Sequence, residues 1–385
     1  MTACGSAAVT NPETPSSAYI HVPFCQHRCG YCDFTLVARK DHLIDDYLAA
    51  MKQQLATVEP GTELQTLFLG GGTPTHLSIE QLRRLFSALF DRFRLADDCE
   101  FSIEANPLNL SIEKIDFLNQ RGVNRVSLGV QSFHSEILTF LERDHQPEQI
   151  FEIVQNLQAR IPNTSLDLIF AVPGQSLSDW ESSLADAVGL GIPHLSTYGL
   201  TIEKGTSFWS RQQSGLFDLP ADDLAGSMYE FSLDYLGSRG LQHYEISNFA
   251  RPGFECRHNE VYWTGYPYYG FGPGAASYLN GVRRQNHRSV TTWLKHVAAG
   301  ESPIAEQEEL DPESRAREAI IFGLRRRVGI DLAEFASRYG FSIPELAESA
   351  IESNIAAGLL EQTETHLRLT QSGCLLADSV VVDFL

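Results

Sequence analysis

The sequence predicts an α/β protein built on a barrel of parallel strands, complete or partial, with a smaller helical domain after it. Between residues 18 and 202, six short apolar segments alternate with segments of helical periodicity, at a spacing of roughly 30 to 40 residues. Strands and helices that alternate in this way favour parallel pairing. From residue 313 onward, three helical segments precede a β-hairpin, which is the pattern of a winged helix.

The barrel elements are predicted in chain order from these patterns. Strands are expected from Ala18, from Leu64 to the glycines at 70–72, and over 100–107, 125–133, 165–174 and 194–202. Helices are expected over 41–58, 78–93, 111–121 and 178–190, with further helices up to about residue 160. Ser78 and Ser111 stand where an N-cap is needed, and Gly122 stands where a helix must end.

The remainder of the chain is predicted to form an extension and a second domain. Residues 201–303 are irregular and aromatic, with a helix over 221–239, an extra strand within 243–250, and an acidic linker over 301–316. Helices are expected over 313–327, 331–339 and 343–358, followed by a hairpin and a last short helix. The predicted divisions are a flexible tail at 1–17, the barrel with its extension at 18–305, and a winged-helix-like domain at 306–385.

Composition excludes several functional classes. The chain has 385 residues and a formal net charge of −20, which argues against nucleic-acid binding because that requires a basic surface. No apolar run is long enough to cross a membrane. Seven cysteines, four of them scattered, suit a reducing cytoplasm, where we expect the protein to act.

The strongest motif is a loop with three cysteines. Cys25, Cys29 and Cys32 follow the first strand in a C-x3-C-x2-C spacing. Three thiolates on one short loop can hold three irons of a cubane cluster and leave the fourth iron open. The alternatives are a zinc site completed by His21 or His27, and three unrelated buried thiols.

Polar or special residues mark the ends of the other predicted strands. These are the glycines at 70–72, Glu104, Gln131, Asp167 and Tyr198. Because active sites of parallel barrels lie at the carboxyl ends of the strands, we expect one site there. Each residue also has a plainer interpretation: the glycines could form a turn, Glu104 a structural ion pair, and Arg143 could pair with Asp167.

A second constellation lies in the extension. The stretch CRHNEVYWTG (256–265) is predicted as a loop that gathers hydrogen-bond donors and aromatic rings. His258 could ligate iron and the aromatic rings could line a macrocycle, or the stretch could be a packed corner with a satisfied histidine. Arg283, Arg284, His287 and Arg288 follow as a basic group, suited to propionates or simply solvated.

Six motifs, in this order, resemble the HemN/HemW branch of the radical S-adenosylmethionine (SAM) family. They are YIHVPFC with the two cysteines after it, LFLGGGTPT, SIEANP, RVSLGVQSF, DLIFAVPGQ and HNEVYW. The resemblance covers the chain from Tyr19 into the C-terminal domain. It implies a partial (β/α)6 barrel, one [4Fe-4S] cluster, and SAM bound to the open iron, where one electron can cleave it to a 5′-deoxyadenosyl radical.

The resemblance also implies roles for individual residues. By motif position, the cluster ligands would be Cys25, Cys29 and Cys32, and the contacts to cluster-bound SAM would be Tyr19, Gly71 and Glu104. Gly72, Thr73, Gln131, Arg143, Asp167 and Gly199 match positions that line a second SAM site in the oxygen-independent coproporphyrinogen III dehydrogenase, and Tyr31 matches an aromatic contact there.

Two departures separate the branches of this family. The dehydrogenase has a further cysteine two residues after the last ligand, where this chain has Phe34, and a longer N-terminal arm that we do not find here. The HNxxYW signature at 258–263 is a mark of the haem chaperones. We therefore expect a haem chaperone that holds the cluster and SAM, binds haem with His258 as a contact, and transfers it to acceptor haemoproteins.

Two other functions remain open at this point. Retention of Gln131, Arg143 and Asp167 keeps the dehydrogenase as the alternative, and a radical SAM enzyme with another substrate is the third. The expected partners are haem, acceptor haemoproteins and an electron donor for the cluster, with peripheral association to membranes that hold haem acceptors.

Overall fold

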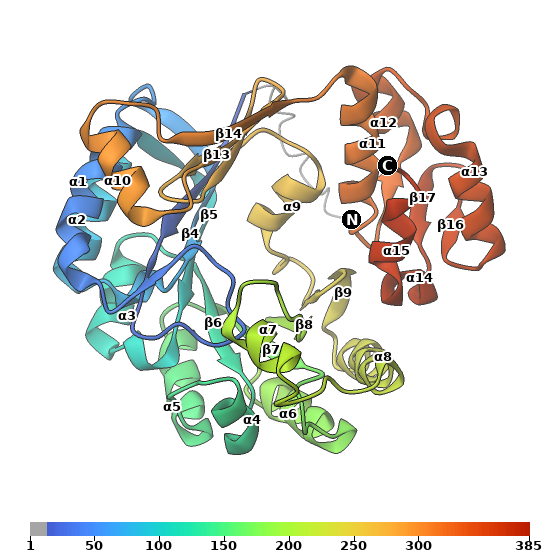
Figure 1. The fold of residues 1–385 in the computed structure, drawn as a ribbon, viewed down its shortest axis with the longest axis horizontal. Coiled ribbons are helices and arrows are strands. Elements are labelled where there is room, and N and C mark those ends of the chain that lie inside the picture. The colour runs from blue at the N-terminus through green and yellow to red at the C-terminus, as the bar shows by residue number, and fades with distance from the viewer. Residues whose placement is uncertain (1–13) are drawn as a thin grey trace, which may run out of the picture.

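A computed structural model describes residues 14–385. Most of the predicted tail at 1–17 lies outside the described residues, but Ser17 already opens the first strand. Six parallel strands lie side by side in chain order and form a curved sheet (Figure 1). They are β1 (Ser17–Val22), β4 (Thr62–Gly71), β5 (Phe93–Ala105), β6 (Arg125–Gln131), β7 (Asn163–Phe170) and β8 (His194–Gly199). The predicted barrel of parallel strands is confirmed.

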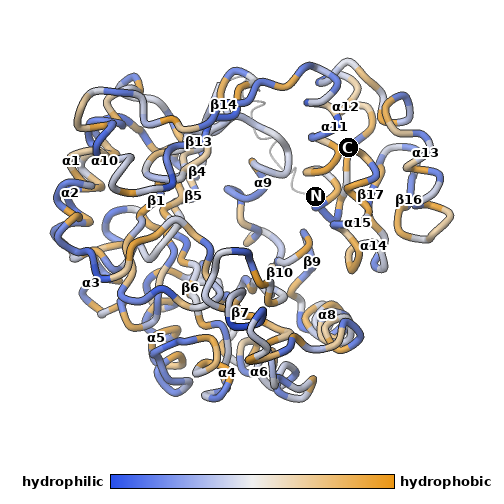
Figure 2. Tube along the Cα trace, viewed as in Figure 1, coloured by the Kyte–Doolittle hydropathy of each residue, from blue (hydrophilic) through white to orange (hydrophobic). Residues whose placement is uncertain are grey.

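The barrel helices follow the outer side of this sheet (Figure 1). They are α1 (Ile44–Leu55), α2 (Ile79–Phe90), α3 (Ile112–Gln120), α4 (Ser135–Phe140), α5 (Pro147–Gln158) and α6 (Leu177–Gly189). Their apolar faces pack on the strands and their polar faces point to solvent, as Figure 2 shows. Ser78 caps α2 in a capping box with Gln81, and Ser111 caps α3, as the sequence predicts.

The sheet continues beyond the six barrel strands at both ends. Strand β11 (Tyr269–Phe271) pairs with β1 in parallel, and β10 (Asn248–Ala250) and β9 (Gln242–Glu245) extend β8 in antiparallel fashion. The nine-stranded order thus runs from β11 to β9. The barrel is therefore partial, because its two edge strands are different segments that do not pair with each other.

The extension is more regular than predicted. The HNEVYW stretch lies within a short helix, α9 (Arg257–Trp263), instead of a loop. The segment predicted as an acidic linker contains a strand, β14 (Ile304–Glu309), whose side chains are almost all exposed because it is the edge of a small antiparallel sheet. Its other elements are α7 (Ser207–Gln213), α8 (Asp222–Ser238), β12 (Ala276–Leu279), β13 (Val282–Asn286) and α10 (Val290–Ala298).

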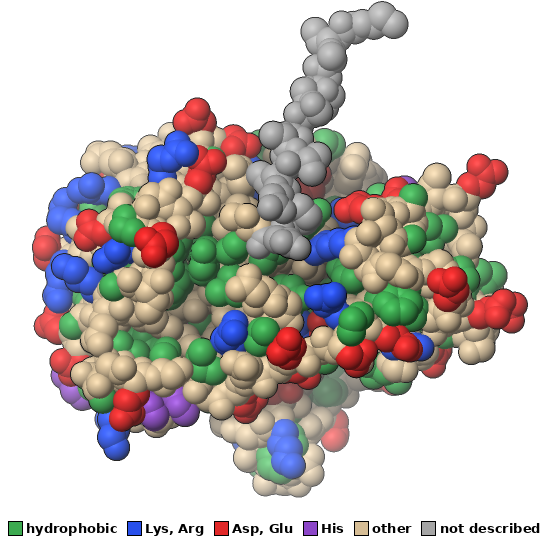
Figure 3. Space-filling model, turned by 90° about the horizontal axis from the view of Figure 1, so that it is seen from above, with side chains coloured by type: hydrophobic (Ala, Val, Ile, Leu, Met, Phe, Trp, Pro, Cys, Tyr) green, Lys and Arg blue, Asp and Glu red, His purple; other side chains and the backbone are tan. Residues whose placement is uncertain are grey.

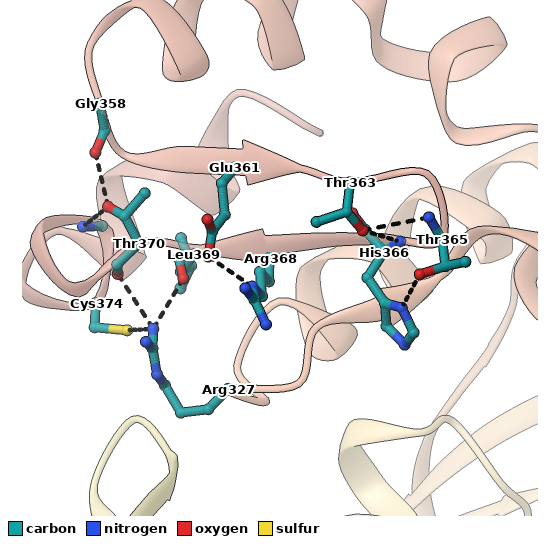
Figure 4. Close-up of polar contacts among 11 residues, drawn as sticks. Arg327, Gly358, Glu361, Thr363, Thr365, His366, Arg368, Leu369, Thr370 and Cys374 are labelled. Atoms are coloured by element: carbon teal, nitrogen blue, oxygen red, sulfur yellow. Dashed lines mark hydrogen bonds and ion pairs between the residues drawn. The ribbon is translucent and has the colours of Figure 1, made fainter.

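The C-terminal domain has the predicted three helices and wing. The elements are α11 (Pro312–Gly323), β15 (Ile330–Asp331), α12 (Leu332–Tyr339), α13 (Ile343–Ala356), β16 (Leu360–Gln362), β17 (His366–Leu369), α14 (Gln371–Leu375) and α15 (Ala377–Val382). Arg327 fixes the wing by donating to the carbonyl oxygen of Leu369 at 2.8 Å and to Cys374 Sγ at 2.8 Å (Figure 4). No helix in the described part of the chain is both long and apolar enough to span a membrane.

Candidate cluster and cofactor site

One cavity of about 420 Å³ opens at the carboxyl ends of the barrel strands. It gathers twelve of the fourteen residues for which the sequence predicts a contact with the cluster, SAM or haem. These are Cys25, Cys29, Tyr31, Cys32, Gly71, Gly72, Thr73, Glu104, Gln131, Arg143, Asp167 and Gly199. Residues from six separate strands and their loops therefore meet at one place, as the rule for parallel barrels predicts.

The cysteine loop is held in a compact shape by one arginine. Strand β2 (Phe24–Cys25) pairs with β3 (Val37–Ala38) and closes the loop at its base. The Arg28 guanidinium donates to the carbonyl oxygens of Cys32 at 3.2 Å, of Phe34 at 3.3 Å and of Leu36 at 2.7 Å. These bonds hold the backbone of the loop, whose three cysteines line the cavity.

The donor set fits an iron–sulfur cluster. All three thiols line one cavity, Cys25 Sγ lies 3.1 Å from Thr73 Oγ1, and Arg143 Nη1 lies 3.8 Å from Cys29 Sγ. Burial raises the pKa of the Cys25 thiol to about 11, and bound iron would reverse this shift because metal-bound thiols are deprotonated. Within residues 14–385, no group of three or more Cys, His, Asp and Glu is placed to hold a metal ion. A single metal ion needs its ligands around one point. In a cubane each thiolate binds its own iron, so the three cysteines do not have to meet at one point.

Glycine is required at the end of β4. Gly71 has φ +110°, and a Cβ there would lie 2.4 Å from the His21 ring. A Cβ on Gly72 would lie 2.9 Å from the carbonyl oxygen of Phe24. The turn interpretation is met at Gly71, and the backbone of β4 packs directly against the strand and loop that carry the first cysteine.

Glu104 lies at the base of the cavity without an ionic partner in the described residues. Its carboxylate accepts the Gly71 N–H at 2.9 Å, so the proposed structural ion pair is not formed. Burial raises the pKa of Glu104 to about 7, although the Gly71 hydrogen bond acts in the opposite direction. A carboxylate in this position can receive an ammonium group of a ligand.

Arg143 and Asp167 do not pair with each other either. Arg143 Nη2 donates to the carbonyl oxygen of Gly129 at 2.7 Å, and Asp167 accepts from Ser127 Oγ at 2.9 Å. Burial raises the pKa of Asp167. Nearby, Gln131 has φ +68°, a backbone conformation that residues other than glycine rarely adopt. Both charged groups therefore remain directed at the cavity.

Two predicted site residues lie elsewhere. Tyr19 packs near Phe68 and donates toward His21 Nδ1 at 3.1 Å. His258 is buried, with Nδ1 at 2.7 Å from Thr66 Oγ1 and Nε2 at 2.8 Å from the Tyr262 hydroxyl. Both ring nitrogens are engaged, so neither is free to ligate iron in this geometry. The packed-corner interpretation of HNEVYW describes the observed contacts of His258.

Helix α9 instead links the barrel to the C-terminal domain. On one side, Glu100 of β5 accepts the backbone N–H of His258 at 3.1 Å. On the other side, Arg326 pairs with Glu260 at 2.7 Å, and Arg338 donates to the carbonyl oxygen of Thr264 at 2.6 Å. Figure 1 shows α9 between the two parts of the molecule.

Sequence reasoning missed the residues that pack against the cysteine loop. A second small core, separate from the main one, contains Phe208 of α7 and lies against Tyr31. The Phe208 backbone N–H donates to the Gly30 carbonyl oxygen at 2.8 Å. Glu142 accepts from Arg211 at 3.0 Å and bonds His27 at 3.1 Å. Only Gly30, between two cysteines, could have indicated such a contact in advance.

A partial barrel of parallel strands, with three cysteines on the loop after its first strand, defines a protein of the radical SAM class. Residues 19–187 match the model of the radical SAM superfamily, and residues 310–376 match that of the HemN C-terminal domain. The solved structure of coproporphyrinogen III oxidase (HemN) from Escherichia coli is similar in fold, with a TM-score of 0.86 at 24% identity over 98% of this chain and 91% of that one.

Sequence relatives define the family more narrowly. The chain is 37% identical to the heme chaperone HemW of Bacillus subtilis (strain 168), over 96% of this chain and 99% of that protein. It is 38% identical to HemW of Lactococcus lactis subsp. lactis (strain IL1403), over 97% and 98%, and 32% identical to HemW of Escherichia coli (strain K12), over 96% and 98%. The chain belongs to the HemW family of radical SAM proteins.

Proposed function

We propose that this protein is a haem chaperone that holds a [4Fe-4S] cluster and SAM, binds haem, and transfers it to acceptor haemoproteins. The observation that carries this proposal is the identity to proteins named heme chaperone HemW over nearly the full length of both chains. Membership in the radical SAM class implies the cluster and SAM. Cys25, Cys29 and Cys32 would hold the cluster, which when reduced supplies the electron for SAM chemistry.

The remaining cavity residues would bind SAM. Glu104 offers a carboxylate for the SAM ammonium group, beside Gly71, which also lines the cavity. Asp167 would accept hydrogen bonds from ribose hydroxyls, and Arg143 would bind a carboxylate. At about 420 Å³, the cavity has the volume of one small-molecule site. This volume supports placing haem outside it.

Phe34 supports the chaperone over the dehydrogenase. Its side chain is 58% exposed at the mouth of the cavity, where the dehydrogenase pattern has a cysteine. An aromatic ring cannot donate a hydrogen atom as a thiol can. We propose that acceptor haemoproteins and an electron donor approach from this side, in the cytoplasm or at a membrane that carries haem acceptors.

The test compares haem transfer with porphyrinogen turnover in one sample. Cluster-reconstituted protein is incubated without oxygen with SAM, dithionite and coproporphyrinogen III, and is then titrated with haem and mixed with apomyoglobin as a model acceptor. The proposal expects stoichiometric haem binding, transfer to apomyoglobin, and no protoporphyrinogen. The HemN-like fold and the retained Arg143 and Asp167 favour the dehydrogenase as the second candidate, and protoporphyrinogen formation would establish it in place of the chaperone.

A further inference from the structure

A second, small cavity lies where the extension meets the C-terminal domain. Its volume is about 40 Å³, which is space for roughly three water-sized groups. Figure 3 shows the molecule from above, with hydrophobic and basic side chains near one another on the middle of this face. The cavity is distinct from the cluster site, because the two share no lining residue.

Arg315 of α11 lines this cavity without a partner. Its Nε atom is buried, and its guanidinium makes no hydrogen bond or ion pair with any residue in 14–385. A buried guanidinium nitrogen that stays unpaired costs free energy, so a water molecule, an ion or a ligand is needed to complete it. By contrast, Arg317, two residues along the same helix, is paired with Glu313 at 2.9 Å.

Tyrosine side chains line the same cavity as Arg315. Five tyrosines from the extension and from α12 line the cavity: Tyr262, Tyr266, Tyr268, Tyr278 and Tyr339. The Tyr262 hydroxyl is already bonded to His258 Nε2 at 2.8 Å. Tyrosine hydroxyls are protonated at neutral pH and burial raises the pKa values of Tyr268 and Tyr339 further, so these two can donate hydrogen bonds. A guanidinium in the same cavity as such donors is suited to a carboxylate, which only accepts.

The charge balance around the cavity favours an anion. Glu318 is already engaged by Arg283, through contacts of 2.6 and 2.8 Å. Arg338 bonds only to neutral carbonyl oxygens and lies over the Tyr266 ring at 4.3 Å. Arg315 and Arg338 thus contribute two positive charges that no carboxylate among the described residues neutralises. This is a local positive site on a chain with a net charge of −20.

We propose that Arg315 and the surrounding tyrosines bind a propionate of haem, so that the porphyrin lies at the junction between the extension and the C-terminal domain. This inference rests on the proposed haem-chaperone function and adds the place of binding. The cavity is large enough for a carboxylate and too small for the ring, so the porphyrin body lies outside it against the half-buried tyrosines. Helix α9, which carries the HNEVYW motif, contributes Tyr262 to this site.

The test measures affinity for two porphyrins by absorbance titration of the full chain. The probes are haem and haem dimethyl ester, in which both propionates are esterified and uncharged. The variants are Arg315→Gln and, as a matched control on the same helix, Arg317→Gln. We expect Arg315→Gln to weaken haem binding about tenfold, as loss of one charged hydrogen bond predicts. Dimethyl ester affinity should be the same for the wild type and this variant, and Arg317→Gln should bind both porphyrins like the wild type.

The other outcomes distinguish failure of the propionate site from failure of the haem-chaperone function. If wild type and Arg315→Gln bind haem equally, the propionate site is wrong and the chaperone function stands. If Arg315→Gln weakens haem and the dimethyl ester alike, Arg315 acts through the structure and the site is also wrong. If the wild type binds neither porphyrin, the chaperone function fails and the site fails with it.

Discussion

The Phe208 ring lies where a side chain on Gly30 would have to be. A Cβ at Gly30 would stand 2.2 Å from Phe208 Cδ1 and 3.1 Å from Glu142 Oε1. The glycine between the second and third cysteines therefore lets the cysteine loop rest directly on the small core below it. The position of the thiols depends on this contact as much as on the cysteines themselves.

Replacing Gly30 should loosen the cysteine loop without removing any of its three cysteines. We expect Gly30→Ala to lower the free energy of unfolding by about 1–3 kcal/mol, since an added methyl overpacks the contact with Phe208. Iron and sulfide content after reconstitution should fall. Gly189→Ala is the control: it lies in α6 with open space around it, and should stabilise by about 0.5–1 kcal/mol with normal iron content. Full iron loading of Gly30→Ala would contradict this account.

Binding of SAM should depend on the ionisation of Glu104. Its pKa, raised by burial to about 7, means that the carboxylate is increasingly protonated below pH 7. Affinity for SAM, measured by calorimetry on the reconstituted protein, should therefore rise with pH through about 7. Glu104→Gln should bind more weakly and show no such rise. An identical pH profile in both proteins would assign the titration to another group.

The same raised pKa affects stability in the ligand-free protein. The folded state holds a proton on Glu104 that the unfolded state releases above its ordinary pKa of 4.5. This group therefore makes the wild type less stable as pH rises from about 4.5 to 7, and the effect levels off above that range. Urea unfolding of Glu104→Gln should lack this contribution. A difference between the two proteins that stays constant with pH would show that the carboxyl does not titrate in this window.

His258 should matter for folding more than for haem. His258→Ala leaves Thr66 and Tyr262 without a partner, and we expect a loss of about 2–4 kcal/mol in the free energy of unfolding at pH 7. Haem affinity of the folded variant should match the wild type. Loss of haem binding with unchanged stability would instead restore His258 as a haem contact.

The pH dependence gives a second check on His258. Burial lowers its pKa from 6.5 to about 3, so the unfolded state binds a proton that the folded state does not between these values. Wild-type stability falls as pH drops below 6.5, and the alanine variant lacks this term. The stability gap between the two proteins should therefore narrow on acidification from pH 7 to 4.

Arg338 should couple α9 to the C-terminal domain. We expect Arg338→Met to lower stability by about 1–2 kcal/mol, because it removes bonds to the Thr264 and Gly265 carbonyl oxygens, both at 2.6 Å. Amide hydrogen exchange in α9 should accelerate, while exchange in β4 stays slow. Arg317→Met removes only an exposed pair within one helix and should change neither.

The sequence was sufficient for the barrel and for most of the cavity. Periodicity located each strand, and the rule that sites lie at strand ends correctly predicts that Glu104, Gln131 and Asp167 lie together. Strand β14 was not predicted, because nearly all its side chains are exposed and its sequence has no alternation of apolar and polar residues. Helix α9 was not predicted, because seven residues are too few for a helical period to be recognised.

Contacts between segments that are distant along the chain could not be predicted from the sequence. Phe208 under Gly30, Glu142 beside His27, and the unpaired Arg315 all depend on which loops meet in three dimensions. The contacts of His258 also depend on which segments meet in three dimensions. Its motif predicts a haem contact, and in this structure the Thr66 hydroxyl of β4 and the Tyr262 hydroxyl bond its two ring nitrogens.

The pairing of β1 with β11 bears on how the protein is made in the cell. The strand that leads into the cysteines has β4 on one side and Tyr269–Phe271 on the other, and Arg288 bonds the carbonyl oxygen of Asp33 at 2.9 Å. At ~5–20 residues per second, a ribosome needs roughly 10–40 s after finishing β4 to deliver these segments. During that interval the nascent β1 has an open edge and the cysteine loop lacks part of its support. The full set of contacts around the cysteine loop is thereby complete only late in synthesis, once residues 269–288 have been made.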